Sequence, residues 1–386
     1  MAKKNTADCP LKKTSIGGQA LIEGIMMRGP DTTSMAVRHV SGNILLENWK
    51  TGGRGRAKIL RAPFIRGVVN MAESLIVGYK CLMRSAELAG LEDEEGNPTE
   101  GPQELGPEDL ERLQKEAGDG VTVRLIGAFR EEPADTDSSD RQEAGVPVNT
   151  AVAVEEKTAV RPAKDGAPKK ETKTSEKFLM TLLMVLSMVL GIGLAVGLFL
   201  FLPALLSSLL GKAAPVMQNQ VLKAVFEGVL RIVLFVAYIA LVSLMKDIRR
   251  VFMYHGAEHK TIFCYEAGEP LTVENIRRQR RFHPRCGTSF LILVLLVGIV
   301  VSMFISVSNP VLRTLIKLLT IPIVVGVGYE LIKLAGRKDN LLTRIISAPG
   351  MWLQHITTKE PDDDMIECAI EAMKVVIPED PDRDNW

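Results

Sequence analysis

The first residues that indicate chemistry are His255, Glu258 and His259, which lie within five positions of one another in a chain of five histidines. On a helix, residues three and four apart share one face, so the two imidazoles and the carboxylate would point in one direction. The order His-x-x-Glu-His is the inverted form of a zinc-protease signature, in which the imidazoles bind the metal. The pattern therefore predicts a metal site with Glu258 as a general base.

A second polar cluster, His283, Arg285 and Cys286, comes immediately before an apolar run. If the preceding apolar run continues as a helix to about Glu266, both clusters meet at one end of a helical bundle. Imidazole and thiolate groups suit zinc or iron. The predicted metal ligands are His255, His259, His283 and Cys286. A structural polar network without a metal is the alternative.

A glycine-rich stretch, residues 17–30, contains Glu23 and Arg28. Glycine density of this kind is typical of a backbone shaped around a ligand, and a tight turn between strands is the alternative. Together with Glu258 and Arg285, these two charged residues make up the predicted catalytic group.

The elements that must position these residues begin with a β-hairpin. Residues 34–40 and 43–49 alternate in polarity around a short polar turn, which is typical of paired strands. Residues 63–89 repeat charged side chains at three- and four-residue steps between apolar ones. This periodicity predicts an amphipathic helix that lies in a membrane interface or packs on a helical bundle.

Four apolar runs in the second half of the chain predict a polytopic membrane protein. Hydrophobic residues make up 46% of the sequence and are concentrated there, and about 20 apolar residues suffice to span a bilayer. The runs cover residues 178–210, 224–245, 288–307 and 311–334. The expected fold is therefore mainly α-helical, with four transmembrane helices, a small N-terminal β-hairpin or sheet, and the amphipathic interfacial helix.

Charge sets the expected orientation. Lysines and arginines gather beside the same ends of the four runs, and such residues mark the cytoplasmic side. Both termini and both histidine clusters are therefore expected in the cytoplasm. Five cysteines without a Cys-x-x-Cys pair indicate no disulfide framework. With 47 basic and 46 acidic residues, no direct nucleic-acid binding is expected.

The predicted division of the chain has five parts. They are residues 1–62 with the glycine-rich block and hairpin, 63–90 with the amphipathic helix, 91–175 as an insert, 176–340 as the membrane domain with a cytoplasmic His/Cys loop at 246–287, and 341–386 as an acidic motif and C-terminal amphipathic helix. The insert is rich in charged residues and poor in aromatic ones, so it is expected to be disordered, except for a short apolar patch at 121–129. Asp362 and its neighbours are expected to cap the last helix, which runs to about residue 376.

Charged residues also lie inside the apolar runs. Four of them, Glu227, Arg231, Arg313 and Lys317, are expected to extend to the outer interface of the membrane. Glu330 lies near the cytoplasmic end of the last run. It is expected to form a salt bridge with a nearby arginine or to line the site.

The sequence blocks GGQALIEGIMMRGP, PFIRG, YHGAEHK, HPRCGTSF and LQHITTKEPDDDMIECAIEA resemble the bacterial YqhQ family, a family of unknown function described as a predicted metal-dependent enzyme. The resemblance covers residues 14–90 and 176–378 and implies a multi-pass protein of the bacterial cytoplasmic membrane. The motif residues that correspond here are Gln19, Glu23, Arg28, Arg66, His255, Glu258, His259, Lys260, His283, Arg285, Cys286, Gln354, Glu360, Asp362 and Asp363.

The leading functional hypothesis is a membrane-embedded, metal-dependent hydrolase with its site at the cytoplasmic interface. Its partners would be the lipid bilayer and an anionic lipid or membrane-surface peptide as substrate. A non-catalytic scaffold or assembly factor, which docks a cytoplasmic or ribosomal partner or a second copy of the chain, is the main alternative. A transporter is the third hypothesis, although no internal repeat is evident.

Overall fold

The computed structural model describes residues 12–52, 57–90, 105–127, 174–213, 216, 219–337, 340–380 and 383–384. The chain forms two units, one of Met1–Phe129 with Ala195–Trp386 and the other of Arg130–Leu194. The described part of the second unit belongs to helix α3 (Thr174–Val196), which exposes apolar side chains such as Leu186 and Leu190. The sheet, the candidate site and the other helices belong to the first unit.

Five antiparallel strands form one sheet in the order β1-β2-β3-β4-β5. They are β1 (Gly17–Leu21), β2 (Gly24–Arg28), β3 (Thr32–Arg38), β4 (Ile44–Lys50) and β5 (Val121–Ile126). The predicted hairpin is confirmed as β3 and β4. Gly42 in its turn has φ of 88°, a conformation that glycine adopts without strain. The glycine-rich stretch forms the preceding hairpin of β1 and β2, so it contains a turn between strands.

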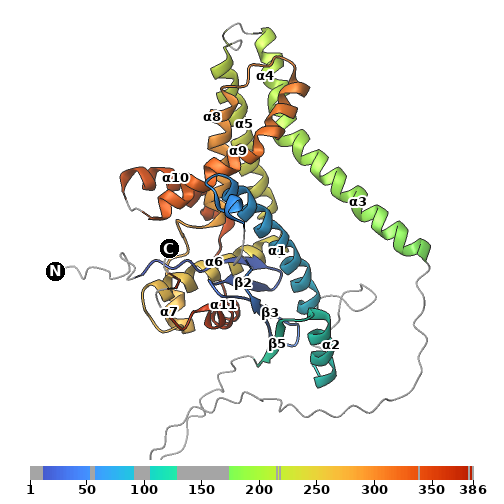
Figure 1. Ribbon diagram of the computed structural model, residues 1–386, viewed down its shortest axis with the longest axis vertical. Coiled ribbons are helices and arrows are strands. Elements are labelled where there is room, and N and C mark those ends of the chain that lie inside the picture. Colours follow the sequence, from blue (N-terminus) through green and yellow to red (C-terminus); the bar gives the residue numbers. More distant parts are fainter. Residues whose placement is uncertain are drawn as a thin grey trace, which may run out of the picture. The chain divides into compact units, whose positions relative to one another are not determined.

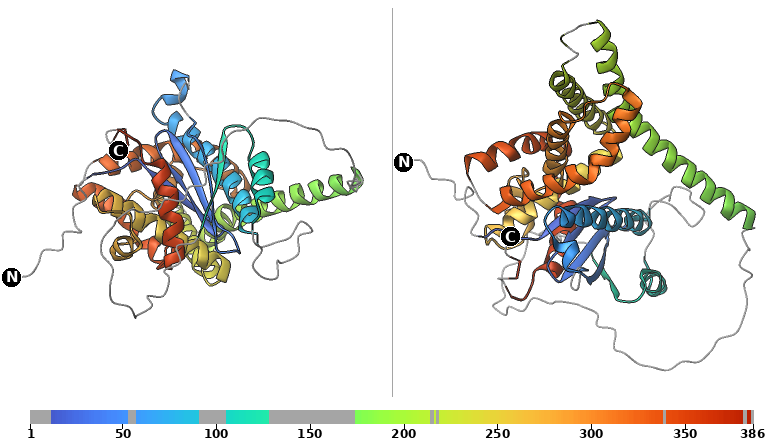
Figure 2. Two further views of the ribbon diagram at one scale, coloured as in Figure 1. Left: turned by 90° about the horizontal axis from the view of Figure 1, so that it is seen from below. Right: turned by 45° about the horizontal axis from the view of Figure 1, so that its top comes forward.

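Helices cover both faces of the sheet, because successive strand residues point to opposite faces. The covering helices are α1 (Ile65–Ala89), α6 (Lys246–Glu266) and α11 (Asp363–Val376). Ile25 and Met27 pack toward α6 and α11, whereas Met26 and Met35 pack toward α1. Figure 1 labels these elements, and the left view of Figure 2 shows the strands between the two groups of helices.

The amphipathic helix α1 is confirmed, and its two faces differ in environment. Gly67 lies against Tyr329 of a later helix, and Gly78 lies against Gln19 of β1, so glycine permits close contact on both sides. The side chains of Leu75 and Tyr79, in contrast, are exposed, at 61% and 60%. The short 3₁₀ segment Lys58–Arg61 precedes this helix.

The predicted insert is partly folded, which corrects the expectation of a disordered segment from 91 to 175. Helix α2 (Pro107–Ala117) and strand β5 lie within it, and β5 pairs with β4 over six residues. The apolar patch at 121–129 does not fold alone. It is stabilised because β4 provides an edge for pairing and Leu113 and Leu125 join the core on the α1 face. Residues 91–104 and 128–173 lie outside the described residues.

Three helical stretches of the described chain are long and apolar enough to cross a membrane: Val185–Lys212, Gln220–Val242 and Pro310–Leu334. They include part of α3, a π-helical segment (Gly197–Phe201), α4 (Leu202–Ala213), α5 (Gln220–Val242) and most of α9 (Pro310–Arg337). The predicted run at 288–307 differs, because its helix α8 (Gly287–Ser302) has only 16 residues. Its length is about 24 Å, against about 30 Å for the hydrocarbon core.

The shortness of α8 has a local cause at each end. Cys286 begins the helix as its N-cap. At the other end, Asn309 accepts hydrogen bonds from the first turn of α9, so the preceding apolar residues form a connection rather than another helical turn. Even so, α8 lies beside both neighbouring helices: Ile299 contacts Gly228 of α5, and Phe290 contacts Gly328 of α9.

The helix that carries the two histidines is not a continuation of the preceding apolar helix, which corrects a second expectation. Helix α5 ends at Val242, and α6 begins at Lys246 after an extended Met245 with ψ of 135°. Because of this break, α6 packs on β1 and α11 rather than extending the apolar bundle.

The charged residues inside the apolar helices are buried, which corrects the prediction that they extend to an interface. Glu227 is 0% exposed, and Arg231, Arg313 and Lys317 are each below 9%. The side chains of Arg313 and Lys317 on α9 reach the carboxylate of Glu227 on α5. Glu330, in contrast, forms the expected salt bridge, with Arg66 of α1.

The tail forms two helices, α10 (Leu341–Thr357) and α11. Asp362 is the N-cap residue of α11, Asp363 and Asp364 lie in its first turn, and the helix ends at Val376, as predicted. Acidic residues at this position interact favourably with the helix dipole.

Candidate metal centre

His255 and His259 lie one turn apart on α6, and their rings face each other with centroids 4.4 Å apart. Each ring is oriented by a main-chain carbonyl. Nδ1 of His255 lies 2.9 Å from the carbonyl oxygen of Thr357, and Nδ1 of His259 lies 2.5 Å from that of Arg281. Because Nδ1 donates its hydrogen in both rings, Nε2 is the nitrogen that faces the space between them.

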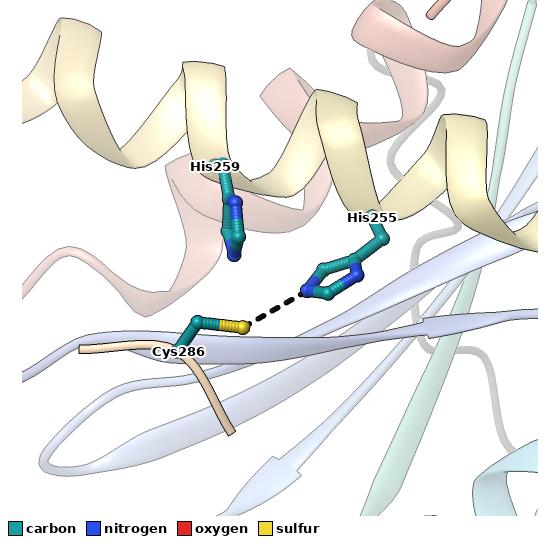
Figure 3. Close-up of side chains that lie close together, drawn as sticks. All are labelled: His255, His259 and Cys286. Carbon is teal, nitrogen blue, oxygen red and sulfur yellow. Dashed lines mark hydrogen bonds between the residues drawn. The ribbon is translucent and has the colours of Figure 1, made fainter. Parts of the chain in front are cut away.

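Cys286, the N-cap residue of α8, completes this cluster. Figure 3 shows its side chain beside those of His255 and His259. Its Sγ lies 3.1 Å from Nε2 of His255. One donor atom from each of His255, His259 and Cys286 lies within 4.8 Å of the other two. Nε2 of His259 is buried and has no hydrogen-bond partner among the described residues. An unpaired buried nitrogen is costly, so its orientation toward the cluster indicates a ligand position.

The electrostatics of the cluster favour a thiolate. Burial raises the pKa of Cys286, but the adjacent imidazoles of His255 and His259 outweigh it and hold the pKa well below its usual range. Burial lowers the pKa of His255, whereas the neighbouring thiolate raises it, with a net value of about 9. The proton between these two groups is the one that a metal ion would displace, since metals bind thiolates and neutral imidazoles.

Glu258 is buried beside the cluster. The backbone N–H of Gly18 in β1 donates a hydrogen bond to its carboxylate. Burial raises the pKa of Glu258, and the neighbouring imidazoles only partly offset this effect. A Cβ atom on Gly18 would lie 3.0 Å from the carboxylate, so glycine permits this approach. A carboxylate with a raised pKa next to a metal site is suited to accept a proton.

His283 lies beside the cluster rather than in it. Its ring centroid is 5.6 Å from that of His259, but its Nε2 faces the carboxylate of Glu266 at 3.8 Å. Its Nδ1 accepts a hydrogen bond from the backbone N–H of Arg285. Burial lowers the pKa of His283 to about 4, although Glu266 acts in the opposite direction. The ring is therefore neutral and both nitrogens have partners.

The predicted catalytic residues outside α6 have other contacts. Arg285 pairs with the buried Glu266. Glu23, which adopts φ of 48° in the turn between β1 and β2, accepts two hydrogen bonds from Arg250, both 2.5 Å long. Arg28 pairs with Glu73 of α1 at 3.0 Å. The structure thus brings neither Glu23 nor Arg285 to the His–Cys cluster.

Arg28 does line a cavity of about 320 Å³ between the β1–β2 hairpin and α1. The lining includes Gly18, Gln19 and, from α1, Ser74 and Val77. Gly18 is common to both features, because it lines the cavity and its N–H bonds Glu258. A small anionic molecule in this cavity would lie next to the strand that holds the buried carboxylate.

Other polar motif residues hold the loops around the cluster. Gln354 of α10 accepts a hydrogen bond from the N–H of His283 at 2.7 Å and donates one to its carbonyl at 2.8 Å. Lys260 and Arg281 both pair with Glu360. Arg277 pairs with Asp363. His355, a further ligand type, stacks on Phe282 and is exposed, away from the cluster.

Sequence reasoning missed the groups that orient the imidazoles. The carbonyls of Thr357 and Arg281 are main-chain atoms, so no side-chain motif indicates them. Gly256 gives an indirect signal. A Cβ atom there would lie 2.0 Å from the carbonyl oxygen of Lys359, so only glycine lets the segment after α10 reach α6.

A family model described as a protein of unknown function, DUF1385, matches residues 62–379. The chain belongs to this family. The DUF1385 match includes His255, Glu258, His259 and Cys286, whereas β1 and β2 precede it. The chain is also similar to the uncharacterized protein YqhQ of Bacillus subtilis, with 27% identity over 365 residues, covering 94% of this chain and 92% of the relative. No solved structure matches.

The neutral, buried His283 predicts a pH dependence of stability. Because its pKa is about 4 in the folded protein and about 6.5 when unfolded, only the unfolded chain takes up this proton between those values. The contribution of His283 to the free energy of unfolding is fully present above pH 6.5. It is lost as the pH falls toward 4, and the loss amounts to up to about 3 kcal/mol. Thermal unfolding of detergent-solubilised protein at a series of pH values measures it.

His283→Gln should flatten the fall in stability between pH 6.5 and 4 relative to the unsubstituted chain. His355→Gln, at an exposed histidine, is the matched control and should leave the slope unchanged. Parallel slopes for the unsubstituted chain and His283→Gln would contradict the assignment of a neutral histidine.

Proposed function

We propose that this DUF1385 chain is an integral membrane protein and a metal-dependent hydrolase that binds zinc or iron through His255, His259 and Cys286. The observation that carries the proposal is the convergence of two Nε2 atoms and one Sγ within 4.8 Å. Both imidazoles are oriented by carbonyls, which is how proteins commonly fix metal-binding histidines. Three protein ligands leave a fourth position open, the pattern of catalytic rather than structural zinc.

A bound ion of this kind would supply Lewis acidity at the open position. The chain's own contribution is the general base. Glu258 lies one residue before His259, is held by the Gly18 N–H and has a raised pKa. It accepts a proton from the attacking water and then donates it to the leaving group, so the carboxylate is regenerated.

The cavity beside β1 supports an anionic substrate. Arg28 contributes a cation and Gln19 an amide to its lining, and apolar contributions come from Met26 and Val77. Arg28 pairs with Glu73 through Nη2, and the guanidinium has further N–H groups for a ligand. A lipid headgroup or a membrane-surface peptide with an acidic group fits this lining.

The three apolar helices and the flanking charges support a cytoplasmic site. Lysines and arginines follow α5 and precede α8, so both ends that border the His–Cys cluster are on the basic side. Contacts of α8 with Gly228 and Gly328 support a crossing by this short helix as well. Four crossings place both termini in the cytoplasm, whereas three would place them on opposite sides.

A second chemistry is supported by a specific observation at the same residues. The thiolate of Cys286 and Nε2 of His255 are 3.1 Å apart, and the Thr357 carbonyl orients the imidazole. Cys286 also stands at the N-terminus of α8, where the helix dipole favours a thiolate. This arrangement suits a nucleophilic cysteine that forms an acyl-enzyme in a metal-free hydrolase.

The metal proposal predicts that purified full-length protein contains about one zinc or iron ion per chain. His255→Ala combined with His259→Ala should remove it, because two of three ligands are lost. His355→Ala and Glu258→Gln should retain it, since neither residue is a ligand. Elemental analysis by mass spectrometry measures the content, and metal retained by the double variant would exclude the site.

The two chemistries differ in the reactivity of Cys286. If the metal proposal holds, iodoacetamide should alkylate Cys286 about tenfold or more slowly in protein with zinc than in protein treated with a chelator. The reason is that a sulfur bound to the ion is not free to react. If the cysteine is the nucleophile, zinc should have no effect and His255→Ala should slow alkylation at pH 6. Cys264 and Cys368, buried with pKa values of about 12, are internal controls. Peptide mass spectrometry gives the rates.

The topology predicts that green fluorescent protein fused after the last residue fluoresces, because it folds in the cytoplasm. Alkaline phosphatase fused after Lys212, at the end of α4, should be active, because it requires the opposite side. Green fluorescent protein fused after Lys212 should not fluoresce, and alkaline phosphatase fused after the last residue should be inactive. An active phosphatase at the C-terminus would show that α8 does not cross the membrane.

A further inference from the structure

A second polar cluster lies inside the apolar bundle, and the metal centre does not use it. Glu227 and Arg231 come from α5, and Arg313 and Lys317 from α9. Ser207 of α4 joins them by donating a hydrogen bond of 2.5 Å to Glu227. All five residues are at least nine-tenths buried.

The contacts of this cluster centre on one carboxylate. Lys317 pairs with Oε2 of Glu227, and Nε of Arg313 lies 3.4 Å from Oε1. Arg231 donates instead to the carbonyl of Phe199 at 2.8 Å. Phe199 belongs to the π-helical segment of Gly197–Phe201, a type of irregularity that is frequent at functional sites.

The charges in the cluster do not balance. Three cations surround a single acid, and the sequence has no other Asp or Glu from residue 197 to 246 or from 275 to 329. Even if Lys317 loses its proton, two guanidinium groups remain against one carboxylate, because arginine does not deprotonate in proteins. An uncompensated charge buried in a bundle is strongly unfavourable, so an anion from outside the chain would stabilise it.

The hydrogen bonds point to the same conclusion independently. Nε and Nη2 of Arg313 are buried and have no hydrogen-bond partner among the described residues. Its Nη1 reaches only the carbonyl of Val307, at 3.5 Å. Buried donors without partners are rare and call for a ligand. Nε faces Glu227 at 3.4 Å in an ion pair, so Nη2 is the open position, and a guanidinium N–H of this kind can donate to a phosphate oxygen.

The cluster is at the opposite end of the bundle from the metal centre. Arg313 lies in the first turn of α9 and Glu330 near its other end, about 26 Å away at 1.5 Å per residue. Gly228, next to Glu227, contacts Ile299 near the end of α8, whereas Cys286 is at the start of α8. Arg313 therefore lies near this end of the bundle, whereas Arg231 lies near the middle of α5.

We propose that Arg231, Arg313 and Lys317 bind a phosphate group at this end of the bundle, either that of an anionic lipid or free phosphate. Arg313 donates Nη2–H to it, and Arg231 and Lys317 add positive charge around it. The site is independent of the metal centre and of the reaction proposed there.

The test uses full-length protein in a non-ionic detergent, with native mass spectrometry and thermal unfolding as readouts. The probes are phosphatidic acid, phosphatidylglycerol and inorganic phosphate. At least one should bind the unsubstituted chain and raise its unfolding temperature. Retention of the lipids alone identifies a headgroup site, and stabilisation by inorganic phosphate alone identifies a free-phosphate site. Failure of all three to bind would overturn the proposal.

Substitutions assign the binding to the cluster. Arg313→Gln should weaken it about tenfold or more, because a cation and its charge-assisted hydrogen bond are lost, whereas Lys212→Gln, at an exposed cation on α4, should not. Binding by Arg313→Gln equal to that of the unsubstituted chain would overturn the proposal.

A gain-of-binding variant separates the site from a structural role. Glu227→Gln removes the single acid and should tighten phosphate binding, since the excess positive charge rises. An effect of this sign does not arise from misfolding. A Glu227→Gln protein that is folded by circular dichroism but no longer binds would overturn the proposal.

Discussion

The candidate site depends on two main-chain carbonyls that reach the same helix from different parts of the chain. Thr357 ends α10 and Arg281 lies between α7 (Val273–Arg278) and α8, yet both accept hydrogen bonds from imidazoles on α6. Each bond fixes which ring nitrogen carries the hydrogen. Without both, the two Nε2 atoms would not face the same space as the thiol of Cys286.

Three features keep those carbonyls in place. Gly256 allows the chain after α10 to touch α6, and the N–H of Lys359 bonds the carbonyl of Phe252 there at 2.8 Å. Gln354 bonds both backbone groups of His283, two residues after Arg281. These contacts join segments that are 71 residues apart for Gln354 and His283 and more distant still for Lys359 and Phe252. Such precise support is what a metal site requires, since ligand orientation decides whether three donors can converge.

Local patterns predicted the elements well, because each depends on periodicity within a few residues. The β3–β4 hairpin, the amphipathic helix α1 and the acidic start of α11 all follow from such patterns. The errors concern features that depend on distant partners. β5 is stable through pairing with β4, more than 70 residues earlier. The break at Met245 separates the preceding apolar helix from α6, which packs on β1 and α11.

The site shows the same division between local and distant information. Spacing alone indicated His255, Glu258 and His259, since they share one face of a single helix. Cys286 was also identified, because it marks the start of an apolar run. Its neighbour His283 could not be separated from the ligands, because its contact with Glu266 depends on the tertiary position of the end of α6.

The two polar clusters differ in how their charge is balanced, and this difference separates their functions. At the sheet, cations and acids match: Arg285 has Glu266, Arg250 has Glu23, and Lys260 has Glu360. Within the His–Cys cluster, Nε2 of His259 has no hydrogen-bond partner among the described residues, and an imidazole nitrogen can bind a metal cation.

In the apolar bundle the unpaired atoms are N–H donors of Arg313, in surroundings that already have excess positive charge. Donors and positive charge attract an anion and repel a metal ion. The excess positive charge in the apolar bundle therefore separates the proposed phosphate site from the proposed metal centre. A metal ion and a phosphate group could bind at the same time, because the two clusters have no residue in common.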